Sequence, residues 1–396
     1  MAKKAVQDVP VKGKLVFVRN DFNVPLNAAG EITDDTRIRA SLPTLRYLLE
    51  SGARVVCSSH LGRPKGEVIP DCSLAPVAKR LGELMGKTVA FCPETVGAKA
   101  EKAKARLKPG QLLLLENLRF HPGETRNDPA FAAELAQGID LYVDDAFGAC
   151  HRAHASIDAI TRCVPLAVAG LLLKKEIDSL RLAADEPARP YLVILGGAKV
   201  SDKIPLLKHL VTKADTILVG GAMAYTFLKA RGMHVGYSKV EDECLDTCLE
   251  ILRRAEAGGV RFLLPMDHIA ATRAEANITV RIIRPGEEIP GEMMGLDIGP
   301  ETVEAYEAEI ARARLVFWNG PMGVFEVGTF SGGTMAIAMA MAASQAMTII
   351  GGGDSLAAVS QAGVAERIGH ISTGGGASLE FLAGDKLPGI EALAEA

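Results

Sequence analysis

The chain has 396 residues, of which 48% are hydrophobic and 23% charged, a composition typical of globular proteins. A single hydrophobic core seldom grows beyond about 250–300 residues, so the length indicates two domains. The formal net charge of −4 excludes recruitment of nucleic acid by bulk charge, and we expect no nucleic-acid partner.

The start of the chain carries no secretion signal that we can recognise. Residues Met1–Val11 are polar and basic and lack a long apolar run, which excludes a signal peptide. The most apolar stretch, Val164–Leu173, is far shorter than the roughly 20 residues that a membrane span needs. We therefore expect a cytoplasmic protein without a membrane partner.

Short apolar runs rich in Val, Ile and Leu recur along the chain and alternate with longer amphipathic stretches. The runs lack strict polar–apolar alternation, so they indicate strands covered on both faces: Leu15–Val18, Val55–Cys57, Leu112–Leu115, Leu141–Val143, Leu192–Leu195, Ile217–Val219, Phe262–Leu264, Leu315–Trp318 and Thr348–Ile350. The stretches between them suit helices, for example Leu42–Ser51, Leu74–Met85 and Ala130–Gln137. Alternating strands and helices predict parallel sheets of the doubly wound, Rossmann-like α/β type.

A domain boundary is predicted near the middle of the chain. Leu171–Ala184 indicates one long helix, and two proline-containing segments around Pro187 and Pro190 follow before a new strand begins at Tyr191. A helix and a proline-rich hinge suit a connector between two sheets. We therefore place the domains at residues 1–170 and 189–384, with the connector at 171–188; one large single-sheet domain is the alternative.

Polar side chains of unusual chemistry follow the strands of the first half. Because the carboxyl ends of parallel strands share one edge, these side chains should meet in one crevice. They are Asp21, Asn23, His60, Arg63, Arg119 and Arg152, and Arg37 could join them from a turn-like stretch. Guanidinium groups bind phosphate and carboxylate bidentately, so the cluster predicts a ligand with two or more negative charges.

Simpler explanations exist for single residues in these patterns. Any one of the arginines could belong to a surface ion pair, and we interpret His151 and His154 as structural. Cys244 and Cys248 could bind a metal, but no second pair or histidine stands at ligand spacing, so small buried hydrophobes are the preferred interpretation. The odd number of cysteines, seven, does not indicate a disulfide framework.

Glycine-rich segments follow the strands of the second half. Glycine lets backbone N–H groups approach a ligand closely, and a helix N-terminus behind such a loop attracts phosphate. Lys199 and Lys203 would share one face if the segment were helical, and Asp354 is placed to hold Mg²⁺ on a phosphate chain. Tight turns alone would explain a single loop, and neither a P-loop nor a GxGxxG pattern is present. The combination indicates a nucleotide site.

The two halves together predict direct phosphoryl transfer between two bound molecules. No activated Ser, Cys or His nucleophile is evident, and such transfer needs mainly positioning and charge neutralisation. Lys203, Arg37, Mg²⁺ and loop N–H groups would balance the charge on the moving group. Closure of two domains around the ligands would exclude water.

Nine segments, in order and spread over nearly the whole chain, closely resemble phosphoglycerate kinases. They are Val16–Pro25 (VFVRNDFNVP), Ser59–Pro64 (SHLGRP), Ser73–Ala78 (SLAPVA), Leu114–Phe120 (LLENLRF), Asp144–His154 (DDAFGACHRAH), Leu195–Lys203 (LGGAKVSDK), Trp318–Glu326 (WNGPMGVFE), Gly351–Asp354 (GGGD) and Ser372–Glu380 (STGGGASLE). The resemblance implies the reversible glycolytic reaction of 1,3-bisphosphoglycerate with ADP to give 3-phosphoglycerate and ATP. It also implies a monomer, a first domain for the glycerate, a second for the Mg-nucleotide, and a tail, 385–396, that packs on the first domain.

The resemblance also implies roles for single residues. It gives the glycerate site as Asp21, Asn23, Arg37, His60, Arg63, Arg119 and Arg152. It gives the nucleotide site as Lys199, Lys203, Gly220, Gly221, Gly295, Leu296, Asn319, Glu326, Gly352, Gly353, Asp354 and Ser355, with Asp354 beside the metal. Gly374, Gly375 and Gly376 would hold the transferring phosphoryl group, and Arg37 and Lys203 would stabilise the transition state.

Three positions depart from the family pattern without threatening it. Asn20 replaces a small or apolar residue, Ser355 stands where Thr is common but keeps a hydroxyl, and Met322 occupies a variable position. Two other functions would fit a similar fold. A kinase for another phosphorylated acid would need a different crevice, and a non-catalytic nucleotide-binding protein should have lost Lys203, Asp354 or Arg37, all of which are present.

Overall fold

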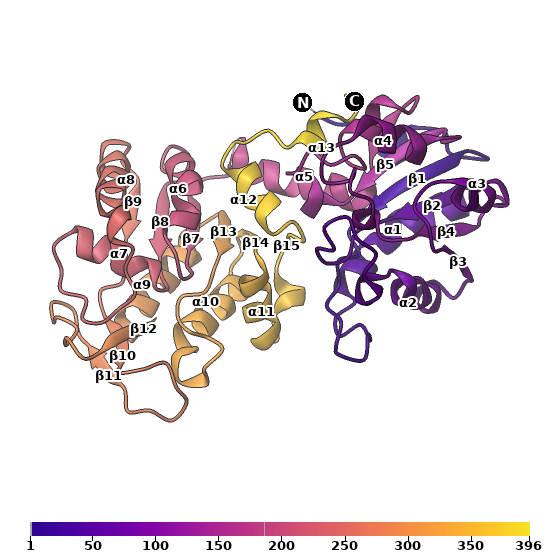
Figure 1. Cartoon of the computed structure of the whole chain (residues 1–396). Helices are drawn as coiled ribbons and strands as arrows, with labels where there is room; N and C mark the ends of the chain where they lie inside the picture. Colours follow the sequence, from indigo (N-terminus) through magenta and orange to yellow (C-terminus); the bar gives the residue numbers. More distant parts are fainter. Residues whose placement is uncertain (1, 186) are drawn as a thin grey trace. The chain divides into compact units, whose positions relative to one another are not determined.

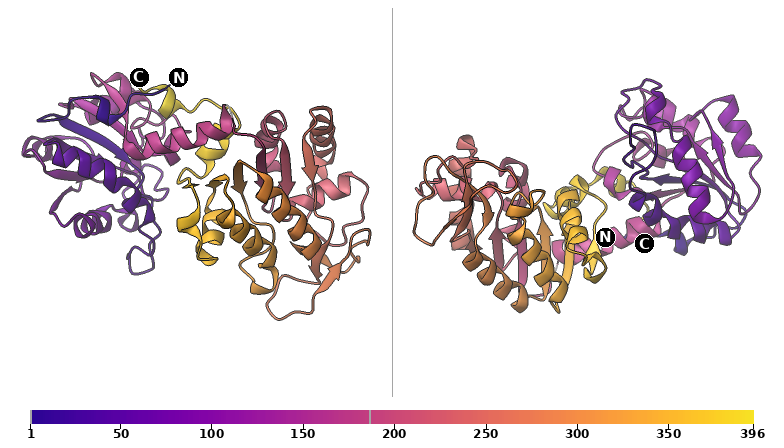
Figure 2. Two further views of the ribbon diagram at one scale, coloured as in Figure 1. Left: turned by 180° about the vertical axis from the view of Figure 1, so that it is seen from behind. Right: turned by 90° about the horizontal axis from the view of Figure 1, so that it is seen from below.

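The computed structural model describes residues 2–185 and 187–396, which form parallel sheets flanked by helices (Figures 1 and 2). Two compact units are present: residues up to Asp178 together with Lys386–Ala396 form the first, and Ser179–Asp385 forms the second. Each unit contains one parallel six-stranded sheet. The predicted doubly wound α/β class is thereby confirmed.

The sheet of the first unit has the strand order β3-β4-β2-β1-β5-β6. Its strands are β1 (Leu15–Asn20), β2 (Arg54–Ser58), β3 (Val89–Cys92), β4 (Leu112–Leu115), β5 (Leu141–Asp145) and β6 (Ala167–Ala169). The central strand β1 pairs with β2 on one side and with β5 on the other. Strands β2, β3 and β4 lie on one side of β1, and β5 and β6 lie on the other, so the strand order changes sides at β1. Open α/β sheets bind ligands at such a point.

Helices cover both faces of this sheet (Figure 1). They are α1 (Thr36–Glu50), α2 (Ala75–Met85), α3 (Ala98–Ala105), α4 (Pro129–Ala136), α13 (Pro388–Glu391) and the first part of α5 (Leu171–Ala184). On one face, Ile38 and Leu45 of α1 and Leu81 of α2 share a buried core with Val18 and Cys57 of the sheet. Helix α1 begins at Thr36 rather than at the expected Leu42. The sequence pattern did not indicate this earlier start, because the first turn is polar and Pro43 interrupts the apolar pattern.

The sheet of the second unit has the order β15-β14-β13-β7-β8-β9, and a separate antiparallel sheet has the order β11-β10-β12. The strands are β7 (Tyr191–Leu195), β8 (Thr216–Val219), β9 (Arg261–Leu263), β10 (His268–Ala271), β11 (Arg281–Ile283), β12 (Met294–Ile298), β13 (Leu315–Asn319), β14 (Met347–Gly351) and β15 (His370–Ile371). Strand β13 is central, with Trp318 level with Ile194 and Ile350.

The helices of the second unit are α6 (Ile204–Leu210), α7 (Met223–Ala230), α8 (Leu245–Ala257), α9 (Pro300–Arg312), α10 (Gly332–Ala343), α11 (Gly353–Gln361) and α12 (Gly376–Leu382). Tyr306 of α9, Ile337 of α10 and Val359 of α11 share one buried core with Trp318. This core fixes the loops that follow β13 and β14.

The tail of the chain packs on the first unit. Lys4 N donates to Ala394 O at 2.9 Å, and Ala394 N donates to Ala167 O at 3.0 Å, so the tail bridges the N-terminal segment and β6. Its apolar side chains are buried, namely Leu387, Ile390 and Leu393. Both ends of the chain therefore belong to one unit.

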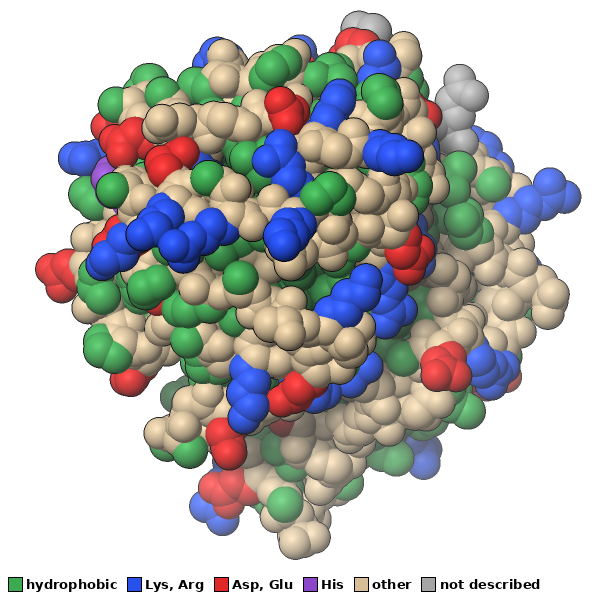
Figure 3. All heavy atoms as spheres, turned by 90° about the vertical axis from the view of Figure 1, so that its right-hand side faces the viewer, with side chains coloured by type: hydrophobic (Ala, Val, Ile, Leu, Met, Phe, Trp, Pro, Cys, Tyr) green, Lys and Arg blue, Asp and Glu red, His purple; other side chains and the backbone are tan. Residues whose placement is uncertain are grey.

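None of the helices in the described part of the chain combines the length and the apolar run needed to cross a bilayer. The face seen in Figure 3 carries Lys and Arg side chains interspersed with Asp and Glu.

Candidate functional site

The carboxyl edge of the first sheet gathers the polar residues that were expected there. Asp21 and Asn23 follow β1, His60 and Arg63 follow β2, Arg119 follows β4, Arg152 follows β5, and Arg37 lies in the first turn of α1. The strands themselves extend further than the apolar runs predicted, because their polar ends continue to pair, as Asn20 does with Asp145.

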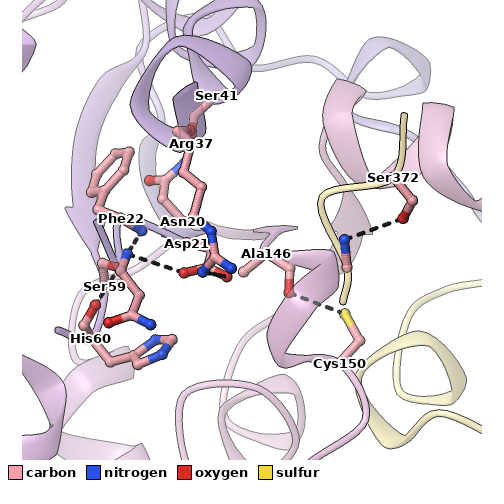
Figure 4. A network of polar contacts seen from close by, with 12 residues as sticks. Asn20, Asp21, Phe22, Arg37, Ser41, Ser59, His60, Ala146, Cys150 and Ser372 are labelled. Carbon is pink, nitrogen blue, oxygen red and sulfur yellow. Dashed lines mark hydrogen bonds and ion pairs between the residues drawn. The ribbon is translucent and has the colours of Figure 1, made fainter. Parts of the chain in front are cut away.

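Asp21 and Asn23 link three of these segments, and Figure 4 shows Asp21 beside Arg37. Arg37 Nη1 donates to Asp21 Oδ2 at 2.9 Å, which brings α1 to the end of β1. Asp21 Oδ1 accepts from Asn23 N at 3.1 Å, and Asn23 Oδ1 accepts from Gly62 N at 2.9 Å. The segments after β1 and β2 are thereby held next to each other.

Arg119 is largely buried next to the segment that follows β2. Its Nη1 donates to Gly62 O at 2.7 Å, beside the exposed Arg63. Its Nε is buried and has no hydrogen-bond partner among the described residues. Burial, with Arg19 and Arg152 nearby, lowers the pKa of Arg119 to about 10, so it remains charged at neutral pH.

Burial lowers the pKa values of three histidines near this edge. Burial, followed by the charges of Arg19 and Arg119, lowers the pKa of His60 well below its ordinary value. Burial and the same arginines lower the pKa of His154 to about 4, and burial with Arg152 lowers that of His151. His151 Nε2 accepts from Arg152 Nε at 3.0 Å. The positive charge of the edge therefore resides on the arginines.

Four further residues take part in this edge and were not expected from the sequence as site residues. Arg19, Glu124 and Ser156 form a buried polar network beneath it, and both side-chain amide atoms of Asn20 are buried without a partner among the described residues. Arg19 lies inside a recognised motif. Glu124 and Ser156 lie in loops, where no spacing rule points to them.

Three loops at the carboxyl edge of the second sheet pack backbone against backbone. Gly196 N donates to Asn319 O at 2.9 Å, and Gly221 N donates to Met322 O at 2.8 Å. A Cβ at Gly196 would lie 2.0 Å from Pro321 O, and one at Gly220 would lie 2.4 Å from Met322 Sδ. These glycines are needed for loop packing, whatever ligand the loops bind.

The packed loops frame a pocket of about 380 Å³. Five of the expected nucleotide-site residues line it: Gly221, Gly295, Leu296, Glu326 and Asp354. The pocket also contains ten residues that were not assigned to the site from the sequence, namely Gly197, Ala198, Ala222, Tyr225, Lys239, Met294, Pro321, Met322, Gly323 and Val324. Six of them, Gly197, Ala198 and Pro321–Val324, lie inside two of the segments that carry the family resemblance. Leu296 and Met322 offer an apolar wall, and Asp354 and Glu326 offer carboxylates.

Lys203 and Asn319 are joined beside this pocket. Lys203 Nζ donates to Asn319 Oδ1, and Asn319 Nδ2 donates to Gly351 O at 2.6 Å. Burial lowers the pKa of Lys203, while Asp202 and Asp354 oppose that shift. Ser355 is buried, and its Oγ accepts from Gly320 N at 2.7 Å. These contacts hold Lys203 at the base of the glycine turn after β14.

Lys199 and Lys203 do not share one helix face, because the segment that contains them is not a continuous α-helix. Lys199 lies exposed in a loop, and a short 3-10 helix covers Ser201–Lys203 before α6 begins at Ile204. The carboxylate of Glu241 accepts from Ser201 N at 3.1 Å and from Ser201 Oγ at 2.6 Å. Glu241 therefore binds the backbone N–H groups of Val200 and Ser201. In a helix that began before this segment, these groups would instead donate to carbonyl groups one turn earlier.

Three of the expected glycines leave open space beside the backbone. An added Cβ at Gly353, Gly375 or Gly376 would meet no atom within 4 Å, so a ligand can approach the backbone there. Gly352 is the N-cap of α11 with φ of 93°, and Asp354 is exposed in the first turn. One exposed carboxylate beside a helix N-terminus, where phosphate would bind favourably, fits Mg²⁺, which prefers a carboxylate plus substrate phosphates.

The two cysteines considered as metal ligands, Cys244 and Cys248, are both buried. Among residues 2–185 and 187–396, no group of three or more His, Cys, Asp and Glu side chains is arranged to hold a metal ion.

Comparison with known proteins identifies the family. The family model described as Phosphoglycerate kinase matches residues 6–385. The chain belongs to the phosphoglycerate kinase family. As a member of this family it is a kinase, that is, a phosphotransferase, with a role in glycolysis.

Individual family members are similar over their whole length. The chain is 54% identical to a phosphoglycerate kinase of Koribacter versatilis over 99% of both chains, and 53% identical to one of Moorella thermoacetica over 100% of both. The solved structure of phosphoglycerate kinase from Coxiella burnetii superposes with a TM-score of 0.91 at 39% identity, covering 98% of each chain. The resemblance seen in the nine segments is thereby confirmed.

Proposed function

We propose that this enzyme catalyses the reversible transfer of a phosphoryl group between 1,3-bisphosphoglycerate and ADP, giving 3-phosphoglycerate and ATP. The first unit binds the glycerate and the second binds the Mg-nucleotide. The observation that carries the proposal is the arginine cluster with neutral histidines at one sheet edge, in a chain whose other sheet carries a glycine-lined pocket with a lysine and a free carboxylate.

The glycerate is assigned to Asp21, Asn23, Arg37, His60, Arg63, Arg119 and Arg152. Support comes from the unpartnered Nε of Arg119 and the charged arginines around it, because a buried donor without a partner costs free energy that an anion would recover. Guanidinium groups suit both the phosphate and the carboxylate of this substrate. Asp21, held by Arg37, can accept a hydrogen bond from the substrate hydroxyl.

The nucleotide is assigned to the pocket beside Leu296 and Gly221 and to Gly220, Gly295, Glu326, Asn319, Lys199, Lys203 and Gly352–Ser355. The apolar wall suits a nucleobase, and the N-terminus of α11 suits phosphate. Asp354 would hold Mg²⁺, which neutralises charge on the phosphate oxygens when bound.

Transfer proceeds without a covalent intermediate on the protein. Lys203, Arg37 and the backbone at Gly375 and Gly376 stabilise the charge of the transferring group, and Asn319 orients Lys203. Direct in-line transfer requires the two substrates to meet, so the proposal includes closure of the two units around them.

The proposal is tested by a coupled assay with 3-phosphoglycerate and Mg-ATP. We expect Lys203→Ala and Arg37→Ala to lower kcat about 100-fold or more, as removal of charge-stabilising donors does elsewhere. Matched controls are Lys208→Ala on α6 and Arg46→Ala on α1, which lie outside the assigned site and should retain activity. Full activity of either site variant would show that the substituted residue does not have its proposed role. If the wild-type enzyme acted only on another phosphorylated acid, the assignment of 3-phosphoglycerate as substrate would be wrong.

We further propose a cytoplasmic monomer that requires Mg²⁺ and acts on small molecules alone. Light scattering should give the mass of one chain at every concentration used in the assay. Chelation of Mg²⁺ should abolish turnover, and added Mg²⁺ should restore it.

A further inference from the structure

Arg19 is a fully buried charge directly beneath the candidate glycerate site. It stands near the end of β1, and its side chain is 0% exposed. Its Nε donates to Ser156 Oγ at 2.9 Å, its Nη1 donates to Asn20 O, and its Nη2 lies 3.2 Å from His60 Nδ1. One guanidinium group therefore joins three separate segments of the first unit.

A buried carboxylate stands behind Arg19. Ser156 Oγ donates to Glu124 Oε1 at 2.6 Å, and Ser156 N donates to Glu124 Oε2 at 3.0 Å. Glu124 is 0% exposed, and its carboxylate supplies a counter-charge that Arg19 reaches through the serine hydroxyl. Because Ser156 Oγ gives its proton to Glu124, it can only accept from Arg19, so the hydrogen bonds from Arg19 to Glu124 run in one direction.

The contact at His60 has only one possible direction. A guanidinium group has donors and no acceptor, so His60 Nδ1 must accept from Arg19 Nη2. A neutral imidazole carries one proton, and that proton must then be on Nε2. Burial of His60 among Arg19, Arg119 and Arg37 disfavours the doubly protonated ring, which could not accept this bond.

We propose that Arg19, held by Ser156 and Glu124, is a positioning residue that fixes His60 as the Nε2–H tautomer. His60 then presents a neutral hydrogen-bond donor to the anionic substrate. In the other tautomer Nε2 would turn a lone pair toward the anion, which is repulsive. This inference rests on the proposed function in assigning His60 to the glycerate site.

Arginine is required here by geometry. Its planar fork reaches Ser156, Asn20 and His60 at the same time, whereas the ammonium group of lysine is a single point on a flexible stem. An Arg19→Lys substitution keeps the charge and removes the simultaneous contacts. It therefore separates the positioning role from the simple presence of a positive charge.

The first test measures the tautomer of His60 in the substrate-free protein by proton–nitrogen NMR, with the His60→Gln variant to assign the signal. At pH 7 we expect a proton on Nε2 and none on Nδ1. Protonation of Nδ1, alone or together with Nε2, would overturn the inference. This outcome is independent of whether Arg19 variants fold.

The second test uses Arg19→Lys and Ser156→Ala, with Arg162→Lys, an exposed arginine paired with Asp158, as the matched control. We expect the site variants to show a mixed His60 tautomer and a KM for 3-phosphoglycerate raised about tenfold, the size of one hydrogen bond to a charged group. The KM for Mg-ATP should stay unchanged. An unaltered tautomer and KM in a folded Arg19→Lys protein would contradict the proposed role.

A third comparison places the donor atom. The amide nitrogen of Gln occupies the place of Nε2, and that of Asn the place of Nδ1. We therefore expect His60→Gln to bind 3-phosphoglycerate more tightly than His60→Asn, and the reverse order would overturn the inference. If the tautomer is as expected but the chain has no activity toward 3-phosphoglycerate, the proposed function fails and the structural role of Arg19 stands.

Discussion

At the scale of single residues, burial changes the pKa values of several ionisable side chains in the first unit. Arg119 at the first sheet edge keeps a pKa of about 10, whereas burial raises the pKa of two carboxyl groups of the same unit, that of Asp144 to about 6 and that of Asp145 to about 7. Asp145 Oδ1 accepts from the backbone N–H groups of Leu172 at 2.9 Å and Leu173 at 3.2 Å. It thereby caps the first turn of α5, the helix that continues into the second unit.

The raised pKa of Asp145 makes stability depend on pH. Aspartate in an unfolded chain has a pKa of about 3.9, so the folded protein binds this proton more tightly than the unfolded chain does. The free energy of unfolding contributed by Asp145 therefore falls as pH rises from about 4 to about 7 and stays lower above that range. Asn at this position keeps the acceptor oxygen and cannot titrate.

We expect Asp145→Asn to be more stable than wild type at pH 8, by about 2–4 kcal/mol beyond any difference at pH 5. Urea unfolding followed by circular dichroism at both pH values measures this difference. Asp246→Asn, at an exposed position on α8, is the control and should show no such change. Parallel pH profiles for Asp145→Asn and wild type would refute the assignment.

The sequence predicted the location of a polar side chain correctly where that residue directly follows a strand. The positions of Asp21, His60, Arg119 and Arg152 at one edge follow from parallel strands alone. The contact between Arg19 and Ser156 joins residues far apart in the sequence, and no periodicity indicates such a pair. Their assigned roles in binding stay predictions until the variants are measured.

At the scale of secondary-structure elements, the close packing of the loops that follow the strands explains several glycines of the second unit. Sequence reasoning explained the glycines by ligand approach, but Gly196, Gly220 and Gly221 stand where loops cross within van der Waals distance. Gly353, Gly375 and Gly376 face open space and are the ones free to serve a ligand. The same residue type therefore has two different uses at one sheet edge.

Gly196→Ala tests the packing use. A Cβ there would lie 2.0 Å from Pro321 O, and the φ of Gly196 is not in the left-handed region, so the effect is purely steric. We expect a loss of about 1–3 kcal/mol in the stability of the second unit, as for other overpacked sites, and weaker nucleotide binding. The fluorescence of Trp318, the one tryptophan of the chain and buried in this unit, reports the unfolding.

Gly291→Ala is the matched control, because an added Cβ there meets nothing within 4 Å and φ is again ordinary. Its stability should stay within about 0.5 kcal/mol of wild type. Equal effects of the two substitutions would show that close loop packing is not what requires glycine at Gly196.

Elements with strong apolar runs were predicted well, and short or half-exposed ones were not. Helix α5 has the predicted bounds, Leu171–Ala184, and all nine predicted strands are present. Strand β3 was missed because its residues are half exposed at the sheet edge, and β6 and β15 because they span only Ala167–Ala169 and His370–Ile371. The antiparallel strands β10, β11 and β12 lie in a segment without a repeated pattern.

The whole molecule consists of two units with separate cores, and this permits a test of the proposed ligand assignment. A ligand that binds only the folded state stabilises it by about 2.7 kcal/mol at 100 times its Kd. We expect ADP with Mg²⁺ to slow amide hydrogen exchange in the loops after β7, β8, β13 and β14. 3-Phosphoglycerate should do so after β1, β2, β4 and β5, and protection of the opposite set would reverse the assignment.

The tail is the second feature that belongs to this scale. Truncation after Asp385 removes Leu387, Ile390 and Leu393 from the core of the first unit, each worth about 1.5–3 kcal/mol when buried. Their sum is comparable to the stability of a whole domain, about 5–15 kcal/mol, so the first unit should unfold far more easily. Circular dichroism should show this early transition, while Trp318 fluorescence should report an unchanged second unit.

The return of the tail to the first unit also fixes an order of events during synthesis. Residues leave the ribosome from the N-terminus onward, and domains generally fold as units. The second unit is continuous in sequence, from Ser179 to Asp385, and is complete as soon as that stretch has emerged. The first unit, although translated first, lacks its contact between Ala394 and Ala167 of β6 until the tail has emerged. We therefore expect the part of the protein that is made earliest to mature last.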